Sequence, residues 1–444
     1  MAIFNMDSIQ AAIKRADPVV QTGRVTRASG VIIEATLPQM AVGKTCSIAV
    51  DHQRSVTAQV VGFNGNTALL MPFDSMQGIR SGAAVVPQGG TEMIPVGDAL
   101  LGRVLDANLK PIDNGPTPFL NEKTPIQGRI PTAMERKRIS APLSMGIRAI
   151  DSFLTVGEGQ RIGIFAGAGV GKSVLLGMLA RNAKADVIIL GLVGERGREV
   201  REFVEKDLGP EGLARSIVVV ATSDEAPLMR IRAALSATAL AEHYRKKGKK
   251  VLLLLDSLTR VAMAQREIGL AIGEPPTSKG YPPSVFAILP KLLERAGRDG
   301  GNGSITALYT VLMEGDDLND PVADSAKSIL DGHFVLSRKL ANSGHFPAID
   351  ILASVSRVMN DLVNDEHKSL ARHGREVLST YNDAADLIDV GAYKPGSNPK
   401  IDQAIMLHEP LNKLLRQLDS ESDSLEETLE QLTALMGGAR SNHA

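Results

Sequence analysis

The sequence predicts an α/β protein in which a parallel β-sheet is covered by helices, preceded by a small β-barrel and followed by an α-helical domain. Two observations support this fold class. The middle of the chain repeats the order apolar strand, loop, helix, which is typical of a parallel sheet with helices on its faces. The flanking regions show either short strands between turn residues or helical patterns alone. We therefore expect an N-terminal helical segment at 1–18, the β-barrel at 19–95, the sheet domain at 96–372 and the C-terminal helical domain at 373–444.

The composition excludes several classes of protein. The chain has 444 residues, enough for two or three domains, and its 49 basic and 50 acidic residues give a net charge of -1. A nucleic-acid-binding protein usually carries a clear basic excess, and only 3% of the residues are aromatic, with no Trp. We therefore expect no nucleic-acid partner. The single Cys46 excludes an internal disulfide, and we interpret it as a small core or surface residue.

The sequence contains no feature typical of secretion or membrane insertion. Its N-terminal stretch reaches Lys14 without the long apolar core of a secretory signal. No apolar run approaches the ~20 residues that a membrane-spanning helix needs. We expect a soluble, cytoplasmic protein that associates peripherally with a membrane through its partners only.

The strands of the two β-containing parts are predicted from short apolar or β-branched runs. In the barrel region such runs alternate with Gly, Asn and Pro turns, at 30–37, 55–61 and 83–86. In the sheet domain the runs are apolar on both faces, as expected for strands covered by helices. These runs lie at 187–192, 216–221, 251–255, 304–311 and 333–337.

The C-terminal region is helical in pattern from about residue 374. An apolar stripe at helical spacing is formed by Leu407, Leu411, Leu414, Leu415 and Leu418. A second helical face follows within an acidic stretch, at Leu425, Leu429 and Leu432. We interpret these stripes as packing surfaces within the chain rather than as a cofactor or membrane site.

The stretch AGAGVGKS at 166–173 is predicted to bind the phosphates of a nucleotide. It lies between an apolar run at 162–165 and a helical pattern at 174–180, which is the strand–loop–helix context that this motif requires. Its glycines let the backbone curl, so that backbone N–H groups and a helix N-terminus face the phosphates. The residues expected to contact the nucleotide are Gly167, Ala168, Gly169, Val170, Gly171, Lys172, Ser173 and Val174.

Individual residues of this loop have distinct expected roles. Lys172 can reach the β- and γ-phosphates, and the Ser173 hydroxyl can hold Mg²⁺. Ala166 stands where the motif usually has its first glycine. Because this position only leaves the strand, before the loop curls, we expect one added methyl group to be tolerated if its φ is negative.

Two carboxylates are candidates for completing a hydrolytic site. Asp256 ends an apolar strand, which would place it beside Mg²⁺ at the carboxyl edge of the sheet, although it could also cap the next helix. Ser257 follows it, so the acid that activates water must come from elsewhere. Glu195 is the best candidate, because it follows a strand at 187–193 that we expect to neighbour the strand of the loop. The alternative for Glu195 is a solvated charge run that extends to Glu205.

Several motifs together resemble one protein family. The loop AGAGVGKS, the tripeptide GER at 194–196, LLLLDSLTR at 252–260 and PAIDILASVS at 347–356 occur in this order. This combination resembles the catalytic subunits of rotary ATP synthases, which implies a RecA-like P-loop core. Within that family the sequence is most similar to the ATPases of type III protein export, in flagella or virulence injectisomes, with the flagellar branch favoured. The stretches that support this lie at 280–286, 292–297, 315–321, 329–333 and 336–341.

The resemblance implies Mg-ATP hydrolysis at the subunit interfaces of a homohexamer. Arg357 resembles the arginine finger that enters the neighbouring subunit's site, although it could instead form a surface salt bridge. Phe346 matches an aromatic residue that stacks on adenine, with Phe in place of Tyr, although it could be a core residue. Arg196 is expected to orient Glu195 or contact phosphate, and Arg260 matches an active-site arginine.

The resemblance also implies partners. The loop at 273–284 resembles the lining of the ring's central pore, where a stalk protein would bind, and the N-terminal segment resembles the contact for a regulatory, stator-like subunit. The ring would unfold or release export substrates and their chaperones at the export gate, at the inner membrane.

Three alternatives share part of this pattern. A catalytic subunit of a proton-translocating ATP synthase or vacuolar-type ATPase would carry the same chemical residues, but in a hetero-hexamer. An RNA-translocating ring would be revealed by RNA-stimulated hydrolysis. A non-catalytic nucleotide-binding subunit would usually lack the acid at Glu195.

Overall fold

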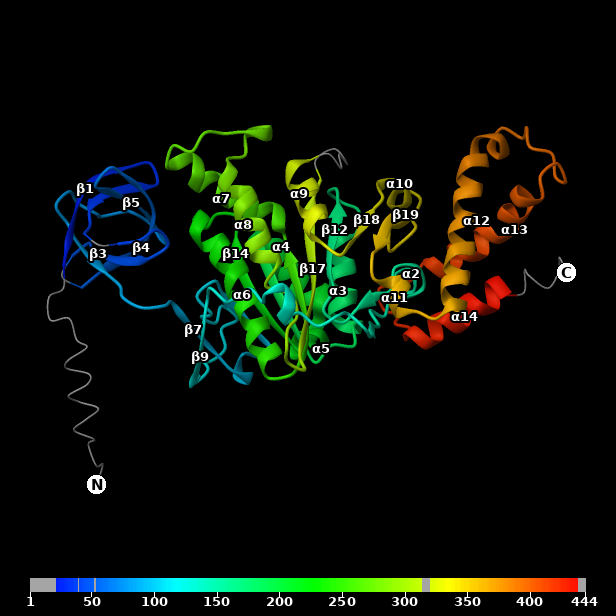
Figure 1. Ribbon diagram of the computed structural model, residues 1–444, viewed down its shortest axis with the longest axis horizontal. Coiled ribbons are helices and arrows are strands. Elements are labelled where there is room, and N and C mark those ends of the chain that lie inside the picture. Colours follow the sequence, from blue (N-terminus) through cyan, green and yellow to red (C-terminus); the bar gives the residue numbers. More distant parts are fainter. Residues whose placement is uncertain (1–20, 39, 52, 314–319, 438–444) are drawn as a thin grey trace, which may run out of the picture. The chain divides into compact units, whose positions relative to one another are not determined.

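The computed structural model describes residues 21–38, 40–51, 53–313 and 320–437 (Figure 1). The predicted N-terminal helical segment at 1–18, and most of the family-specific stretch at 315–321, lie outside the described residues. The chain divides into two compact units, one formed by 1–91 with 226–228 and 267–275, the other by the remaining residues. Within the described ranges, no helix is long and apolar enough to cross a membrane.

The first unit contains the predicted β-barrel. Its six strands close in the order β1-β2-β5-β4-β3-β6. Cys46 lies in the barrel core, where burial raises the pKa of its thiol to about 12. Of the two alternatives, a core or a surface residue, the structure shows the core residue. The predicted runs at 30–37, 55–61 and 83–86 correspond to β2, β4 and β6. The strand bounds are β1 Gly23–Ser29, β2 Ile32–Thr36, β3 Thr45–Ala49, β4 Ser55–Asn64, β5 Thr67–Pro72 and β6 Ala84–Pro87.

The second unit is built on a largely parallel sheet with the strand order β19-β18-β12-β17-β15-β13-β14-β8. Along this path only β19 is antiparallel to its neighbour, and the short β16 (Gly297–Arg298) pairs with β17 outside it. All five predicted runs of the sheet domain are strands. The bounds are β8 Arg103–Asp106, β12 Arg161–Ala166, β13 Val187–Glu195, β14 Ser216–Thr222, β15 Lys250–Asp256, β17 Ser304–Leu312, β18 Gly332–Leu336 and β19 Ile349–Ser356.

The expected place of the strand that carries Glu195 was wrong. This strand, β13, pairs with β14 and β15, and both β15 and β17 lie between it and β12, the strand of the phosphate loop. The crossover after β12 carries the chain past two strand positions that later segments fill. β12 and β13 are therefore not neighbours although they follow one another in the chain, but their carboxyl ends still meet at one edge of the sheet.

Helices surround this sheet, and they begin and end as follows. Those between the strands are α2 Arg148–Phe153, α3 Lys172–Asn182, α4 Gly197–Glu202, a π-helical turn at Phe203–Leu208, α5 Gly209–Ala214, α6 Pro227–Lys246, α7 Leu258–Ala271, α8 Pro283–Leu293, α9 Pro321–Ile329, α10 Arg338–Asn342 and α11 Met359–Leu362. The C-terminal helices are α12 Asp365–Asp389, α13 Pro399–Leu415 and α14 Leu425–Gly437.

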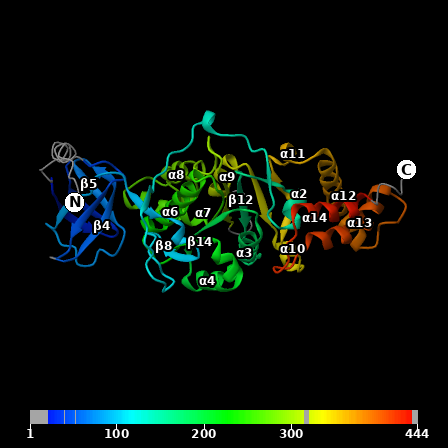
Figure 2. The ribbon, with the colours of Figure 1, turned by 90° about the horizontal axis from the view of Figure 1, so that it is seen from below.

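The C-terminal helices pack beside α2 and share one hydrophobic core with the sheet (Figures 1 and 2). Four leucines of the predicted stripe, at 407, 411, 414 and 415, are buried there, as is Leu432. Leu418 does not belong to the stripe: α13 ends at Leu415, and Leu418 is 66% exposed. The fold class is therefore confirmed. The domain boundary at 372/373 falls inside α12 and stays a prediction.

A buried ion pair in the second unit is expected to be essential for stability. Arg295 donates two hydrogen bonds of 2.8 Å to Glu242, and their side chains are only 4% and 3% exposed. Glu242→Gln should lower the free energy of unfolding by about 3–5 kcal/mol, because it leaves the arginine charge buried and uncompensated. Urea unfolding followed by circular dichroism measures this change. The control Glu205→Gln, in an exposed pair with Arg201, should have almost no effect, and equal effects would contradict the prediction.

Candidate active site

The phosphate loop connects β12 to α3 at the carboxyl edge of the sheet. Gly169 and Gly171 have φ values of 76° and 87°, in the left-handed region that favours glycine. Gly171 also forms the N-cap of α3, so the helix N-terminus faces the loop, as an anion-binding site requires. Ala166 is the buried last residue of β12 and is not among the residues with positive φ. Its methyl group therefore causes no backbone strain, so alanine is tolerated where the motif usually has glycine.

Lys172, the first residue of α3, joins two acidic residues that end different strands. Its Nζ lies 2.5 Å from Oδ1 of Asp256, which ends β15, and 3.6 Å from Oε1 of Glu195, which ends β13. The three side chains are largely buried. Both acids were predicted from strand ends, and Lys172 reaches both because the strand ends share one edge of the sheet.

Thr310 was not predicted from the sequence, but it belongs to this cluster. Its Oγ1, on β17, donates a hydrogen bond of 2.5 Å to Oδ1 of Asp256. The two recorded side-chain contacts of Asp256 thus use the same oxygen, which leaves Oδ2 available among the described residues. The signal for Thr310 was weak: a single hydroxyl near the end of an apolar strand.

Glu199, on the first turn of α4, is a second residue that sequence reasoning missed. Burial raises the pKa of Glu195, Lys172 opposes this, and Asp256 and the hydrogen bond with Glu199 raise it further. Desolvation acts against the ionised form of Glu199, but hydrogen bonds from Glu195 and Arg196 outweigh it and lower the pKa of Glu199. The pKa of Glu195 is thus shifted upward and that of Glu199 downward. The spacing i, i+4 across the start of a helix could have suggested the pair.

The residues at this edge fit a magnesium ion bound together with nucleotide. A cavity of about 80 Å³ is lined by Ser173, Leu192, Glu195, Glu199, Val200, Phe203 and Asp256. Its hydroxyl and carboxylate oxygens are ligands that Mg²⁺ prefers. Across the described ranges, no group of three His, Cys, Asp or Glu residues could hold a metal ion by itself. Mg²⁺ usually takes one or two protein ligands and completes its shell with water and substrate phosphates.

Phe346 lies against the phosphate loop. A Cβ atom added at Gly171 would lie 3.2 Å from both Cδ1 and Cε1 of the Phe346 ring. The side chain is 44% exposed, so Phe346 is not a core aromatic. Its position beside the last glycine of the loop is compatible with a ring that contacts a nucleotide base.

The two other predicted arginines lie near the carboxylates but have different surroundings. Arg196 is exposed and pairs with Glu199 at 3.0 Å, not with Glu195. Arg260, on α7, packs against Gly194, where an added Cβ would lie 2.8 Å from the Cβ of Arg260. Its buried Nε has no hydrogen-bond partner among the described residues.

Arg357 lies at the opposite edge of the sheet from the phosphate loop of its own chain. Ala166 pairs with Leu336, and Leu336 with Ile349, at the loop edge. Gly332 pairs with Ser356, next to Arg357, at the other end of the same strands. Arg357 is exposed, donates one hydrogen bond to the Lys327 carbonyl at 3.2 Å, and forms no ion pair within the described part of the chain. The structure therefore does not bring Arg357 together with the other predicted site residues.

The loop geometry predicts that one of two small substitutions weakens ATP binding and that the other has no effect. Gly171→Ala should weaken ATP binding about tenfold or more, because alanine in the left-handed region costs about 1–2 kcal/mol and its methyl group would press on Phe346. Ala166→Gly should leave ATP affinity unchanged. Titration of each variant with Mg-ATP at equal folded content checks both outcomes, and a loss of affinity in Ala166→Gly would contradict the role assigned to Ala166.

Comparison with known families matches three parts of the chain. Residues 146–356 match the nucleotide-binding domain of the ATP synthase alpha/beta family, and residues 25–89 match the beta-barrel domain of that family. Residues 363–434 match the T3SS EscN ATPase C-terminal domain.

Related proteins match over almost their whole length. A flagellum-specific ATP synthase of Pseudomonas aeruginosa is 53% identical over 429 residues, covering 96% of this chain and 95% of the relative. A type 3 secretion system ATPase of Sinorhizobium fredii is 48% identical over 431 residues, covering 97% and 95%. The solved structure of the assembled ATPase EscN from the type III secretion system of enteropathogenic E. coli has a TM-score of 0.88 and 44% identity. It covers 93% of this chain and 100% of that chain.

These matches confirm the resemblance found in the sequence, including its ATPase activity, and they agree with the barrel, sheet and helical parts of the fold. Because both flagellar and secretion relatives match at similar identity, they do not separate the two branches. The chain belongs to the type III protein export ATPases, a branch of the ATP synthase alpha/beta family.

Proposed function

We propose that this ATPase hydrolyses Mg-ATP in a homohexameric ring and energises type III protein export, with flagellar export favoured over an injectisome. One observation carries the ring: Arg357 is exposed at the sheet edge opposite its own phosphate loop. An arginine in that place cannot serve its own site, but it can complete the site of a neighbouring subunit.

The first step is phosphate binding by the loop. Lys172 forms ion pairs with Asp256 and Glu195. The phosphates would take over Lys172 and the loop N–H groups, while Phe346 stacks on the base and Arg260 supports the strand end at Gly194. Ser173 and Asp256 would hold Mg²⁺, which neutralises charge that develops on the phosphates.

The second step is attack of water on the γ-phosphorus. Glu195 accepts a proton as the new oxygen–phosphorus bond forms and the bond to the bridging β–γ oxygen breaks, so that the charge leaves with ADP. Glu199 lies beside Glu195 and is itself held by its ion pair with Arg196. Arg357 from the next subunit stabilises charge on the transferred phosphoryl group, an effect that amounts to about 10³- to 10⁵-fold in related phosphoryl-transfer systems.

The export role rests on the relatives. The C-terminal match to the EscN-type domain favours an export ATPase over a rotary synthase subunit. EscN has also been solved in complex with its central stalk EscO, and that structure is 43% identical to this chain. By analogy, the loop at 273–284 would face a stalk protein in the ring pore. Successive hydrolysis around the ring would unfold or release substrates and chaperones at the export gate, with a regulatory, stator-like subunit at the N-terminus and membrane contact through partners.

Replacing the proposed base tests the chemistry. Glu195→Gln should leave the Kd for ATP nearly unchanged and reduce kcat by about 10²- to 10⁴-fold, because the amide cannot accept a proton. In the wild-type protein kcat/KM should fall as the pH is lowered through the pKa of Glu195, which lies above its ordinary value of 4.5. The exposed Glu202→Gln is the control for charge removal. Full turnover in Glu195→Gln would remove this residue from its role.

Mixing two inactive variants tests the ring. Lys172→Ala lacks a working phosphate loop, and Arg357→Ala lacks the proposed finger, so each protein alone should be nearly inactive. In mixed rings an intact loop can meet an intact Arg357, and ATPase activity should reappear. The wild-type rate per protomer should also rise with protein concentration and then saturate. A mixture that assembles but stays inactive would exclude Arg357 as a finger acting between subunits.

A further inference from the structure

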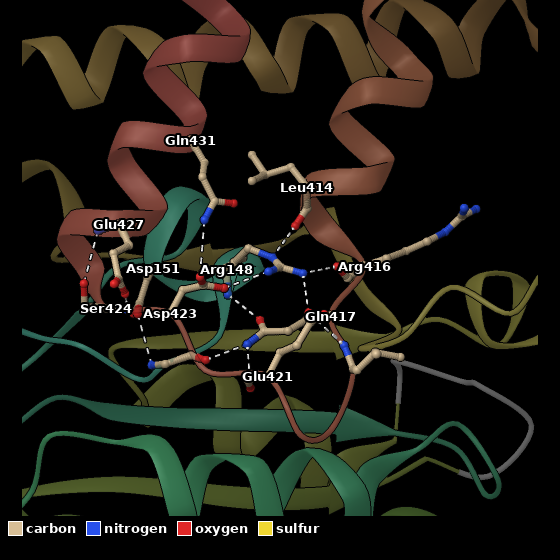
Figure 3. A network of polar contacts seen from close by, with 12 residues as sticks. Arg148, Asp151, Leu414, Arg416, Gln417, Glu421, Asp423, Ser424, Glu427 and Gln431 are labelled. Atoms are coloured by element: carbon tan, nitrogen blue, oxygen red, sulfur yellow. Dashed lines mark hydrogen bonds and ion pairs between the residues drawn. The ribbon is translucent and has the colours of Figure 1, made fainter.

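Arg148, whose side chain is 14% exposed, holds both ends of the segment between α13 and α14, residues 416–424 (Figure 3). Arg148, at the start of α2, donates from Nε to the Leu414 carbonyl at 2.9 Å and from a terminal nitrogen to the Arg416 carbonyl at 2.6 Å. Carbonyls at a helix C-terminus lack partners within the helix, and a cation there is favourable. Arg148 therefore terminates α13 and fixes where the following segment begins.

The same guanidinium fixes the other end of the segment. It donates to Glu421 at 2.8 Å and to Asp423 at 2.7 Å, just before α14 begins (Figure 3). Gln417, almost fully buried, accepts from the Arg148 backbone N–H at 2.8 Å and donates to the Gly146 carbonyl at 2.9 Å. Arg148 thus binds segment 416–424, which is far away in the sequence, with both its backbone and its side chain.

This segment also reaches the nucleotide site. The backbone N–H of Gln417 donates to the Phe346 carbonyl at 2.9 Å. Arg181 and Asn182, at the end of the phosphate-loop helix α3, donate to the carbonyls of Asp419 and Glu421 at 2.7 and 3.3 Å. The segment held by Arg148 therefore contacts both the backbone of Phe346 and the helix α3, which begins at the phosphate loop.

We propose that Arg148 is a positioning residue for the base-binding end of the nucleotide site, acting through segment 416–424 on Phe346. This inference rests on the proposed stacking role of Phe346. The ring is partly exposed and lies on a glycine, so little side-chain packing holds it, and the hydrogen bond from Gln417 anchors its backbone. A ring that is already in place binds a base without a further ordering cost, whereas a loose one loses part of that affinity.

The proposal differs from a purely structural role in one measurable way. Pyrophosphate has the phosphates that occupy the loop but no base, whereas ADP has both phosphates and a base. We expect neither ligand to be hydrolysed. If Arg148 only stabilised the fold, its loss would affect both ligands alike. If it positions Phe346, its loss weakens ADP binding and spares pyrophosphate. The informative quantity is therefore the ratio of the two Kd values.

The experiment is calorimetric titration of the full chain with ADP and with pyrophosphate, both in the presence of Mg²⁺. In Arg148→Gln the preference for ADP over pyrophosphate should fall about tenfold, within the range expected for one base–aromatic stack. The matched control is Arg103→Gln on the edge strand β8. Arg103 is 16% exposed, compared with 14% for Arg148, and also binds a carboxylate and a carbonyl. This control should keep the wild-type preference.

Two further variants separate the possible outcomes. Phe346→Ala should lose the same preference; if it does not, the stacking role itself is wrong. If Phe346→Ala loses it and Arg148→Gln does not, only the positioning role of Arg148 is overturned. Should Arg148→Gln fail to fold, Glu421→Gln removes one of its ion pairs at a more exposed position and should lower the preference in the same direction. An unchanged ratio in that variant would count against the proposal.

Discussion

The ion pair between Lys172 and Asp256 is the interaction on which the rest of the site depends. It joins the first residue of the phosphate-loop helix to the end of a central strand, and both charges are largely withdrawn from water. Buried charges are costly unless they are paired. Lys172 therefore lies between Asp256 and Glu195, and Thr310 donates a hydrogen bond to the same Asp256.

The two edges of the sheet carry different groups. The carboxyl edge gathers the phosphate loop, Lys172 and the carboxylates of Asp256 and Glu195, and the segment that Arg148 holds contacts Phe346 there. The opposite edge presents Arg357 to the surroundings. Because β19 runs antiparallel to β18, the strand that follows Phe346 at one edge delivers Arg357 to the other. The antiparallel strand β19 thus connects Phe346, beside the phosphate loop, to the exposed Arg357 at the opposite edge.

Much of this site could be predicted from the sequence because its residues stand at places with strong local signals. The phosphate loop has a fixed spacing, and Asp256 and Glu195 follow long apolar strands. The order of the strands could not be predicted, since β15 and β17, which follow later in the chain, lie between β12 and β13. The same limit hid Thr310, whose contact with Asp256 joins two strands. Glu199 was missed although its contacts with Glu195 and Arg196 are local. Leu418 was misassigned because nothing in the local pattern marks the end of α13, which Arg148 terminates from 266 to 268 residues away.

The burial of Cys46 has a practical consequence for site-specific labelling of this ATPase. Reaction with a thiol reagent needs an accessible thiolate, and the only cysteine of the chain is enclosed in the barrel with a strongly raised pKa. A cysteine introduced on an exposed helix would therefore carry a fluorophore or a bead at one defined position, without first removing a native residue. The natural chain is thus already suited to site-specific labelling for single-molecule observation of its turnover.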